Sequence, residues 1–203
     1  DGGWGNGEVQ TYTNSAENAK VLDGSLIITA KADGSGGYTS ARLKSQGLRK
    51  FTYGRIEVRA KLPASAGTWP AIWMLGSNFT TVGWPTCGEI DIMEQTGANK
   101  DNTLGTLHWY NTTANGNASY GETTAVADAS SDFHLYTVEW SDTSIKIYLD
   151  DVNFFQMAND STLPFNADFF MILNIAMGGT LGGDIDPSFT EDTMEIDYVK
   201  VFQ

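Results

Sequence analysis

Three acidic residues, Glu89, Asp91 and Glu94, lie close together near the middle of the chain. Glu89 and Asp91 alternate with Ile90 and Ile92, a pattern that predicts a β-strand with its acids on one face and its isoleucines in a core. A row of carboxylates is suited to the hydrolysis of a glycosidic bond, in which one carboxylate attacks while another stays protonated. The alternative is a solvated acidic strand without chemistry.

The position of Glu94 requires a local irregularity in this strand. In a regular strand its side chain would turn into the core, because it lies an odd number of residues from Glu89, and an unpaired carboxylate there would cost free energy. A β-bulge at Ile92 and Met93 adds one residue and returns Glu94 to the acidic face. The sequence therefore predicts three acids in one row, with raised pKa values because like charges repel. It also predicts that the carboxyl groups of Glu89 and Glu94 lie about 5–5.5 Å apart.

The stretch from Gly88 to Glu94 resembles the catalytic strand of glycoside hydrolase family 16 in its bulged form. Residues 69–75 and 83–85 resemble the segments that precede this strand in bacterial-type endo-β-1,3-glucanases, the laminarinases. The resemblance covers essentially the whole chain. It implies an endo-acting enzyme that cleaves internal β-1,3-glucosidic bonds of β-glucans such as laminarin, with retention of the anomeric configuration.

The resemblance also implies a role for each residue of the site. Glu89 would be the nucleophile, Glu94 the general acid and base, and Asp91 would tune both by hydrogen bonding and charge; this chemistry needs no cofactor. Five further residues would bind the substrate: Asn6, Arg59, Trp73, Trp84 and His108. Flat indole rings suit stacking on sugar rings, and Arg59 near the acids would help to keep a carboxylate ionised. Trp69 is equally compatible with the core and with the cleft.

A structural metal is a further implication of the resemblance. Relatives often bind Ca²⁺ away from the cleft, through a carboxylate that matches Asp197, a backbone carbonyl that matches Gly24, and a carbonyl from an N-terminal segment. That segment, about twenty residues with an edge strand, is expected to be missing before Trp4. Because Ca²⁺ takes six to eight oxygen ligands, Gly24 and Asp197 alone would form a weak site.

The rest of the chain reads as about a dozen short strands without a long amphipathic helix or a repeat, so we predict one all-β domain over residues 1–203. Residues 55–62 alternate most regularly, and their charged side chains would ordinarily form a solvated face. Residues 169–176 are nearly all apolar and predict a central strand buried on both faces. These features favour an antiparallel two-sheet β-sandwich. The resemblance specifies a jelly roll with a concave substrate cleft.

The composition restricts the partners of the protein. The formal net charge of −13 disfavours nucleic acids, anionic membranes and anionic polysaccharides as partners. The sequence contains no run of 18 apolar residues, so no membrane-spanning helix is predicted. The single cysteine, Cys87, excludes an internal disulfide and is expected to be a buried thiol. We therefore expect a secreted monomer that acts on a neutral β-1,3-glucan outside the cell.

Two alternatives remain at this stage. The first is a non-catalytic β-glucan-binding module, although Glu89, Asp91 and Glu94 are all present. The second is the same chemistry on another polymer, either a mixed-linkage β-1,3/1,4-glucan or a galactan.

Overall fold

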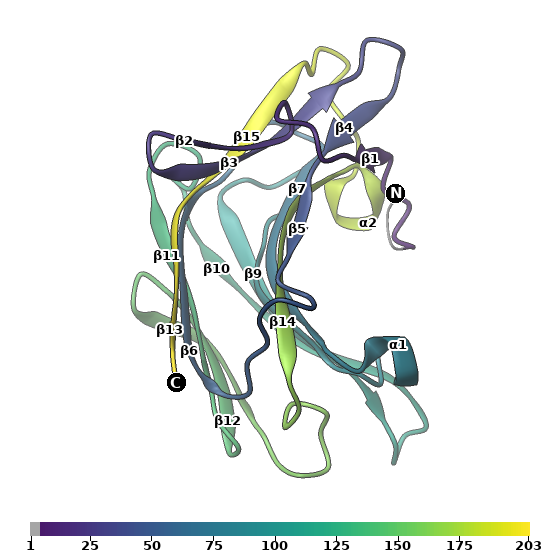
Figure 1. Ribbon diagram of the computed structural model, residues 1–203, viewed down its shortest axis with the longest axis vertical. Helices are drawn as coiled ribbons and strands as arrows, with labels where there is room; N and C mark the ends of the chain where they lie inside the picture. The colour runs from purple at the N-terminus through teal and green to yellow at the C-terminus, as the bar shows by residue number, and fades with distance from the viewer. Residues whose placement is uncertain (1–4) are drawn as a thin grey trace.

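Short alternating segments pair into two sheets that pack face to face, as a computed structural model of the chain shows for residues 5–203 (Figure 1). The larger sheet has nine strands, and eight of them follow the order β1-β4-β3-β15-β6-β11-β12-β13, with β2 paired to β3. Its strands are β1 (Gln10–Tyr12), β2 (Ala19–Leu22), β3 (Ser25–Ala32), β4 (Tyr38–Ser40), β6 (Gly54–Lys61), β11 (His134–Trp140), β12 (Ser144–Leu149), β13 (Val152–Ala158) and β15 (Glu191–Phe202).

The smaller sheet has six strands in the order β10-β9-β8-β7-β14-β5. Its strands are β5 (Arg42–Lys44), β7 (Thr68–Gly76), β8 (Glu89–Glu94), β9 (Asn102–Asn111), β10 (Gly116–Ala125) and β14 (Phe169–Met177). Two single-turn helices, α1 (Phe79–Val82) and α2 (Gly179–Gly182), interrupt the loops. The predicted antiparallel jelly-roll sandwich is confirmed, with one departure: β1 pairs with β4 in parallel.

The core lies between the two sheets. Alternate residues of β6, namely Ile56, Val58 and Ala60, are at most 1% exposed and face it from the larger sheet. Every residue of β14 is buried, as its apolar sequence predicts. The core covers one face, and the candidate site together with a smaller apolar cluster around Phe170 and Ile172 covers the other. Cys87 is a buried free thiol, as expected, and burial raises its pKa to about 11.

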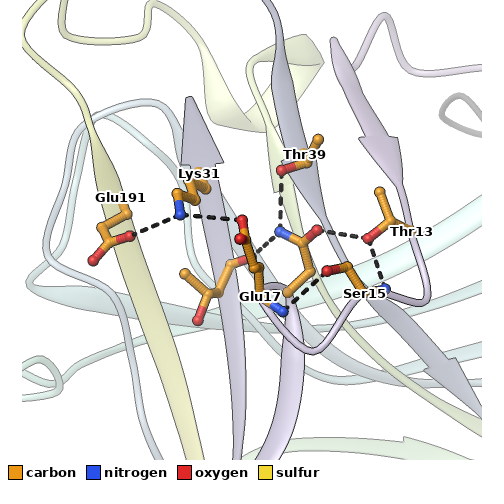
Figure 2. Close-up of polar contacts among 8 residues, drawn as sticks. Thr13, Ser15, Glu17, Lys31, Thr39 and Glu191 are labelled. Atoms are coloured by element: carbon orange, nitrogen blue, oxygen red, sulfur yellow. Dashed lines mark hydrogen bonds and ion pairs between the residues drawn. The ribbon is translucent and has the colours of Figure 1, made fainter. Parts of the chain in front are cut away.

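A polar network on the larger sheet anchors the segment between β1 and β2 (Figure 2). The side-chain amide of Asn18 donates to the carbonyl of Thr29 (3.0 Å) and to Oγ1 of Thr39 (3.1 Å). Lys31 pairs with Glu17 at 3.2 Å and Glu191 lies 3.9 Å from the same ammonium. These contacts fix the path of the chain as it leaves β1, which supplies one wall of the site. Across residues 5–203, no helix is long and apolar enough to cross a membrane.

Candidate active site

The acidic strand β8 contains the predicted bulge. On its β9 side, Asp91 lies opposite Thr106 and Glu94 lies opposite Leu104, so β8 carries one residue more than its partner over this interval. The register to β7 shifts at the same place. A bulge adds one unpaired residue and reverses the alternation of side chains beyond it.

The consequence of the bulge is the row of acids that the sequence predicts. Ile92 and Met93 are both buried in the core, at 1% and 0% exposure. Glu89, Asp91 and Glu94 line one cavity on the opposite face of the sheet. Because of the bulge, Glu89 and Glu94 lie on the same face of the sheet although they are an odd number of residues apart.

Each of the two glutamates accepts a hydrogen bond from a different tryptophan. Nε1 of Trp84 donates to Oε2 of Glu89 at 2.8 Å, and Nε1 of Trp69 donates to Oε1 of Glu94 at 2.9 Å. Trp84 is 53% exposed at the rim of the site, whereas Trp69 is only 8% exposed. Trp69, which the sequence does not assign, thus lies in the cavity beside an acid.

The middle acid, Asp91, lies beside a histidine. Nε2 of His108 is 3.3 Å from Oδ2 of Asp91, and the His108 ring packs 6.0 Å from the ring of Trp84. Oδ2 of Asp91 is buried and accepts no hydrogen bond from residues 5–203. The structure therefore places His108 next to the acid row, as predicted.

Burial raises the pKa of all three acids, and repulsion between carboxylates adds to the effect for Glu89 and Asp91. For Glu89, burial raises the pKa well above its ordinary value, and the charge of Asp91 adds to this, while His108 and Trp84 lower it. Burial, followed by repulsion from Glu94, raises the pKa of Asp91 well above its ordinary value. Burial also raises the pKa of Glu94, against the hydrogen bond from Trp69 and the charge of His108. A raised pKa favours the protonated form of a carboxyl group, which general acid catalysis requires.

Because the folded chain raises the pKa of Glu94, this group lowers stability at neutral pH. In the unfolded chain Glu94 ionises above about pH 4 without a desolvation penalty. Its favourable contribution to stability is therefore complete only below that pH and is lost as pH rises through the folded pKa.

Glu94→Gln, which can still accept the hydrogen bond from Trp69, is expected to raise the melting temperature at pH 7, by about 2–4 °C for each kcal/mol gained in the free energy of unfolding. The gain should disappear near pH 3. The matched control is Glu122→Gln on the exposed face of β10, which should leave the melting temperature nearly unchanged; a fall for Glu94→Gln at pH 7 would contradict the expectation.

The floor of the cavity is formed by a chain of polar contacts beside Trp73. Nε1 of Trp73 donates to Oδ1 of Asn174 at 2.7 Å, and Nδ2 of Asn174 donates to the hydroxyl of Tyr12 at 3.2 Å. The Arg42 guanidinium lies 4.1 Å from the centre of the Tyr12 ring. Trp73 therefore lies in the site, as predicted.

Sequence reasoning did not assign Tyr12 and Arg42 to this cavity, although both line it. Arg42 reaches the cavity because β5 pairs with β14, which sets Arg42 opposite Asn174. That pairing joins residues far apart in the chain, and no local pattern indicates it.

The N-terminal loop closes one side of the cavity. Asn6 and Glu8 both line it, and the backbone N–H of Asn6 donates to Oε2 of Glu8 at 3.1 Å. The Asn6 carbonyl accepts from the Thr180 N–H at 3.0 Å, which joins the loop to α2 (Figure 1). Asn6 is thus in the predicted place, while Trp4 lies outside the described residues.

The prediction for Arg59 is wrong. Arg59 lies on β6 of the larger sheet, between the buried residues Val58 and Ala60, so its side chain points away from the core and from the smaller sheet. It forms an ion pair with Asp197 at 2.7 Å and lies 4.6 Å from the centre of the Phe133 ring. The alternation of β6 thus has its ordinary meaning, a solvated charged face.

The predicted calcium site at Gly24 and Asp197 offers few ligands among the described residues. The strand register brings the two near each other, since Ile196 lies opposite Leu26. However, the carboxylate of Asp197 is already paired with Arg59, and within residues 5–203 it belongs to no group of three or more His, Cys, Asp or Glu side chains that could hold a metal ion. One paired carboxylate and one carbonyl fall short of the oxygen ligands that Ca²⁺ takes.

The family model for glycosyl hydrolases family 16 matches residues 6–200. The chain belongs to this family. It is 42% identical over 219 residues to a β-glucanase from Rhodothermus marinus, a match that covers 99% of this chain and 76% of the relative. A glucan endo-1,3-β-glucosidase from Cryptopygus antarcticus is 39% identical, with 98% and 82% covered.

Solved structures agree with this assignment. The crystal structure of LamAcat from Zobellia galactanivorans matches with a TM-score of 0.92 and 46% identity, covering all of this chain and 87% of that chain. A Glu-to-Ser variant of LamA from the same organism was solved in complex with laminaritriose and laminaritetraose, and it matches with a TM-score of 0.91 and 45% identity, covering 100% and 88% of the two chains. The chain is therefore a glycoside hydrolase of the endo-β-1,3-glucanase type.

Proposed function

We propose that this glycoside hydrolase cleaves β-1,3-glucan by double displacement, with Glu89 as nucleophile and Glu94 as general acid and base. The observation that carries the proposal is the bulge in β8, which sets Glu89 and Glu94 in one cavity and gives each a separate tryptophan donor. Glycosidases require two carboxyl groups that flank the scissile bond, and the predicted separation of about 5–5.5 Å would make the reaction retaining.

In the first step, the Glu89 carboxylate attacks the anomeric carbon and forms an ester bond while the glycosidic C–O bond breaks. The proton of Glu94 passes to the leaving oxygen. In the second step, Glu94 takes a proton from water as the water oxygen attacks the anomeric carbon and releases Glu89. The raised pKa of Glu94 supports its role as the group that holds a proton before cleavage.

Asp91 helps to explain how Glu89 can be ionised while Glu94 holds a proton. Burial and the charge of Glu94 raise the pKa of Asp91 well above the ordinary value, and the neighbouring Glu89 carboxyl lowers it in part. A proton on Asp91 would remove the repulsion that raises the pKa of Glu89 and would make Asp91 a donor to that carboxylate. Glu89 would then be ionised, as a nucleophile must be, with Trp84 as its second donor.

The stereochemistry of the first product tests the mechanism. Laminarin digested in an NMR tube is expected to give the β-anomer of the new reducing end first, with the α-anomer rising later by mutarotation. An initial α-anomer would require direct attack by water and would overturn the role of Glu89 as nucleophile. Products of intermediate length at early times would support endo action.

The polymer is proposed to be a neutral β-1,3-glucan, with mixed-linkage β-1,3/1,4-glucan and galactans as the alternatives. The sugar contacts would come from Trp73 and Trp84, whose indoles border the acid row, and from Asn6. A reducing-sugar assay on laminarin, lichenan and agarose separates these substrates. Background rates on all three, with oligosaccharide still bound, would favour the non-catalytic binding module instead.

We also infer secretion and a monomeric state. The support is general: a polymeric substrate lies outside the cell, and a net charge of −13 opposes nucleic acids and anionic membranes as partners. Calcium binding at Gly24 and Asp197 stays a prediction, which would require Asp197 to leave Arg59. A higher melting temperature on adding calcium chloride to EDTA-treated protein would support it.

A further inference from the structure

Lys100 lies partly buried in the turn between β8 and β9. Its ammonium donates to the carbonyl and to the hydroxyl of Thr68, both at 2.8 Å. Thr68 is fully buried and directly precedes Trp69, the tryptophan that donates to Glu94. Lys100 thus holds the backbone from which the Trp69 side chain extends.

The backbone of Lys100 also holds the strand that carries Glu94. Its carbonyl accepts a hydrogen bond from the side-chain amide of Gln95 at 2.8 Å. Gln95 is fully buried and directly follows Glu94. Thr103, a little further along, donates from Oγ1 to the carbonyl of Glu94 at 3.2 Å. One residue therefore joins the position before Trp69 to the position after Glu94.

The surroundings of Lys100 are tightly packed. A Cβ atom on Gly97 would lie 1.8 Å from the Gly182 carbonyl oxygen and 2.9 Å from Cα of Gly67, so three loops meet here with little freedom. Burial lowers the pKa of Lys100 to about 8, against the charge of Asp192, the one acidic group that acts on it. Placing an ammonium in such a site costs free energy that an apolar side chain would not.

We propose that Lys100 is a positioning residue for the general acid and base: it fixes Trp69 so that the indole N–H meets the carboxylate of Glu94. The proposal rests on the role of Glu94 proposed above. The bond from Trp69 lowers the pKa of Glu94 against the effect of burial. Loosening Trp69 should therefore raise that pKa and move the alkaline limb of the pH profile upward.

The test is the pH profile of kcat/KM on laminarin for Lys100→Met, Trp69→Phe and the double variant. Each single variant is expected to move the alkaline limb upward by about one pH unit, the size of one lost charge-assisted hydrogen bond. The double variant should resemble Trp69→Phe alone, because both changes remove the same contact. Thr68→Val, which removes one of the two acceptors, is a gentler variant that should move the limb in the same direction.

A second readout uses the leaving group. A dinitrophenyl laminaribioside needs little help from an acid, so kcat/KM for this substrate should stay within about threefold of the wild type in Lys100→Met. The rate for laminarin should fall through kcat, with KM little changed. The matched control is Lys61→Met, because Lys61 pairs with Glu195 on the larger sheet; it should lose stability without moving the limb.

The possible failures differ from one another. Two results would overturn the proposal. If the alkaline limb of the pH profile does not move in Lys100→Met and Thr68→Val, Lys100 has only a structural role. If the shifts of the limb add up in the double variant, Lys100 acts on Glu94 only through its charge. An active Glu94→Gln, together with an unmoved limb in Trp69→Phe, would instead overturn the role of Glu94, and the proposal with it.

Discussion

Glu89→Ser is expected to lower kcat on laminarin by about 10⁴-fold or more, because the variant has no carboxylate to form the glycosyl–enzyme ester. Binding of a laminari-oligosaccharide should persist, since Asn6 and Trp73 in the cavity wall and Trp84 at its rim are unchanged. Isothermal titration with laminaritetraose measures the binding, and a reducing-sugar assay measures the turnover. Loss of both would indicate that Glu89 supports the fold or the binding of sugar rather than the chemistry.

Added azide separates the roles of the two glutamates. With a dinitrophenyl laminaribioside, Glu89→Ser and azide should give the α-glycosyl azide, because azide enters the space of the missing nucleophile and inverts the anomeric carbon. Glu94→Ala and azide should give the β-glycosyl azide, since the ester to Glu89 still forms and azide needs no general base to open it. If Glu89→Ser gave the β-glycosyl azide and Glu94→Ala the α-glycosyl azide, Glu94 would be the nucleophile and Glu89 the general acid and base. The Glu122→Gln variant on β10, treated in the same way, should give neither azide.

Much of the active site was predictable because the acids lie within one short segment, whose alternation of polar and apolar residues indicates their positions. The alternation of Glu89, Ile90 and Asp91 indicates which side chains share a face, and the cost of burying Glu94 indicates the bulge. The structure confirms the bulge and brings the three acids together. The separation of the two carboxyl groups stays a prediction.

The rest of the site depends on pairings that no local pattern encodes. Arg59 and Arg42 are both basic residues on short strands, yet the first faces outward from the larger sheet and the second lines the cavity. Their positions follow from the partner of each strand: β6 lies between β15 and β11, while β5 pairs with β14. The family resemblance led to the correct expectation that Trp84 and His108 lie beside the acids, whereas its placement of Arg59 in the cleft failed because β6 lies in the other sheet.

Two variants that each change the length of β8 by one residue test the bulge itself. Deleting Met93 leaves a regular strand in which Glu94 falls at even spacing from Glu89, so both acids stay in the cavity. With the bulge still in place, inserting one alanine after Met93 reverses the face of Glu94 and turns its carboxylate toward the core. We expect the deletion to keep measurable activity on laminarin, lowered by about 10²-fold for a displacement of about 1 Å, and the insertion to keep none.

The free energy of unfolding of Met93→Ala separates the effect of the lost Met93 side chain from the effect of a displaced Glu94 carboxylate. Met93 is fully buried in the core, so Met93→Ala should lower the free energy of unfolding by about 2–5 kcal/mol while activity at low temperature stays close to the wild type. The deletion loses the same side chain, and any further loss of activity therefore reports the displaced carboxylate. The insertion keeps Met93 but turns Glu94 toward the core, so it should also be destabilised at pH 7. If a crystal structure of the insertion shows that the bulge is kept, equal activity in the deletion and the insertion would show that the orientation of Glu94 does not matter, which is incompatible with a shared cleft between two carboxylates.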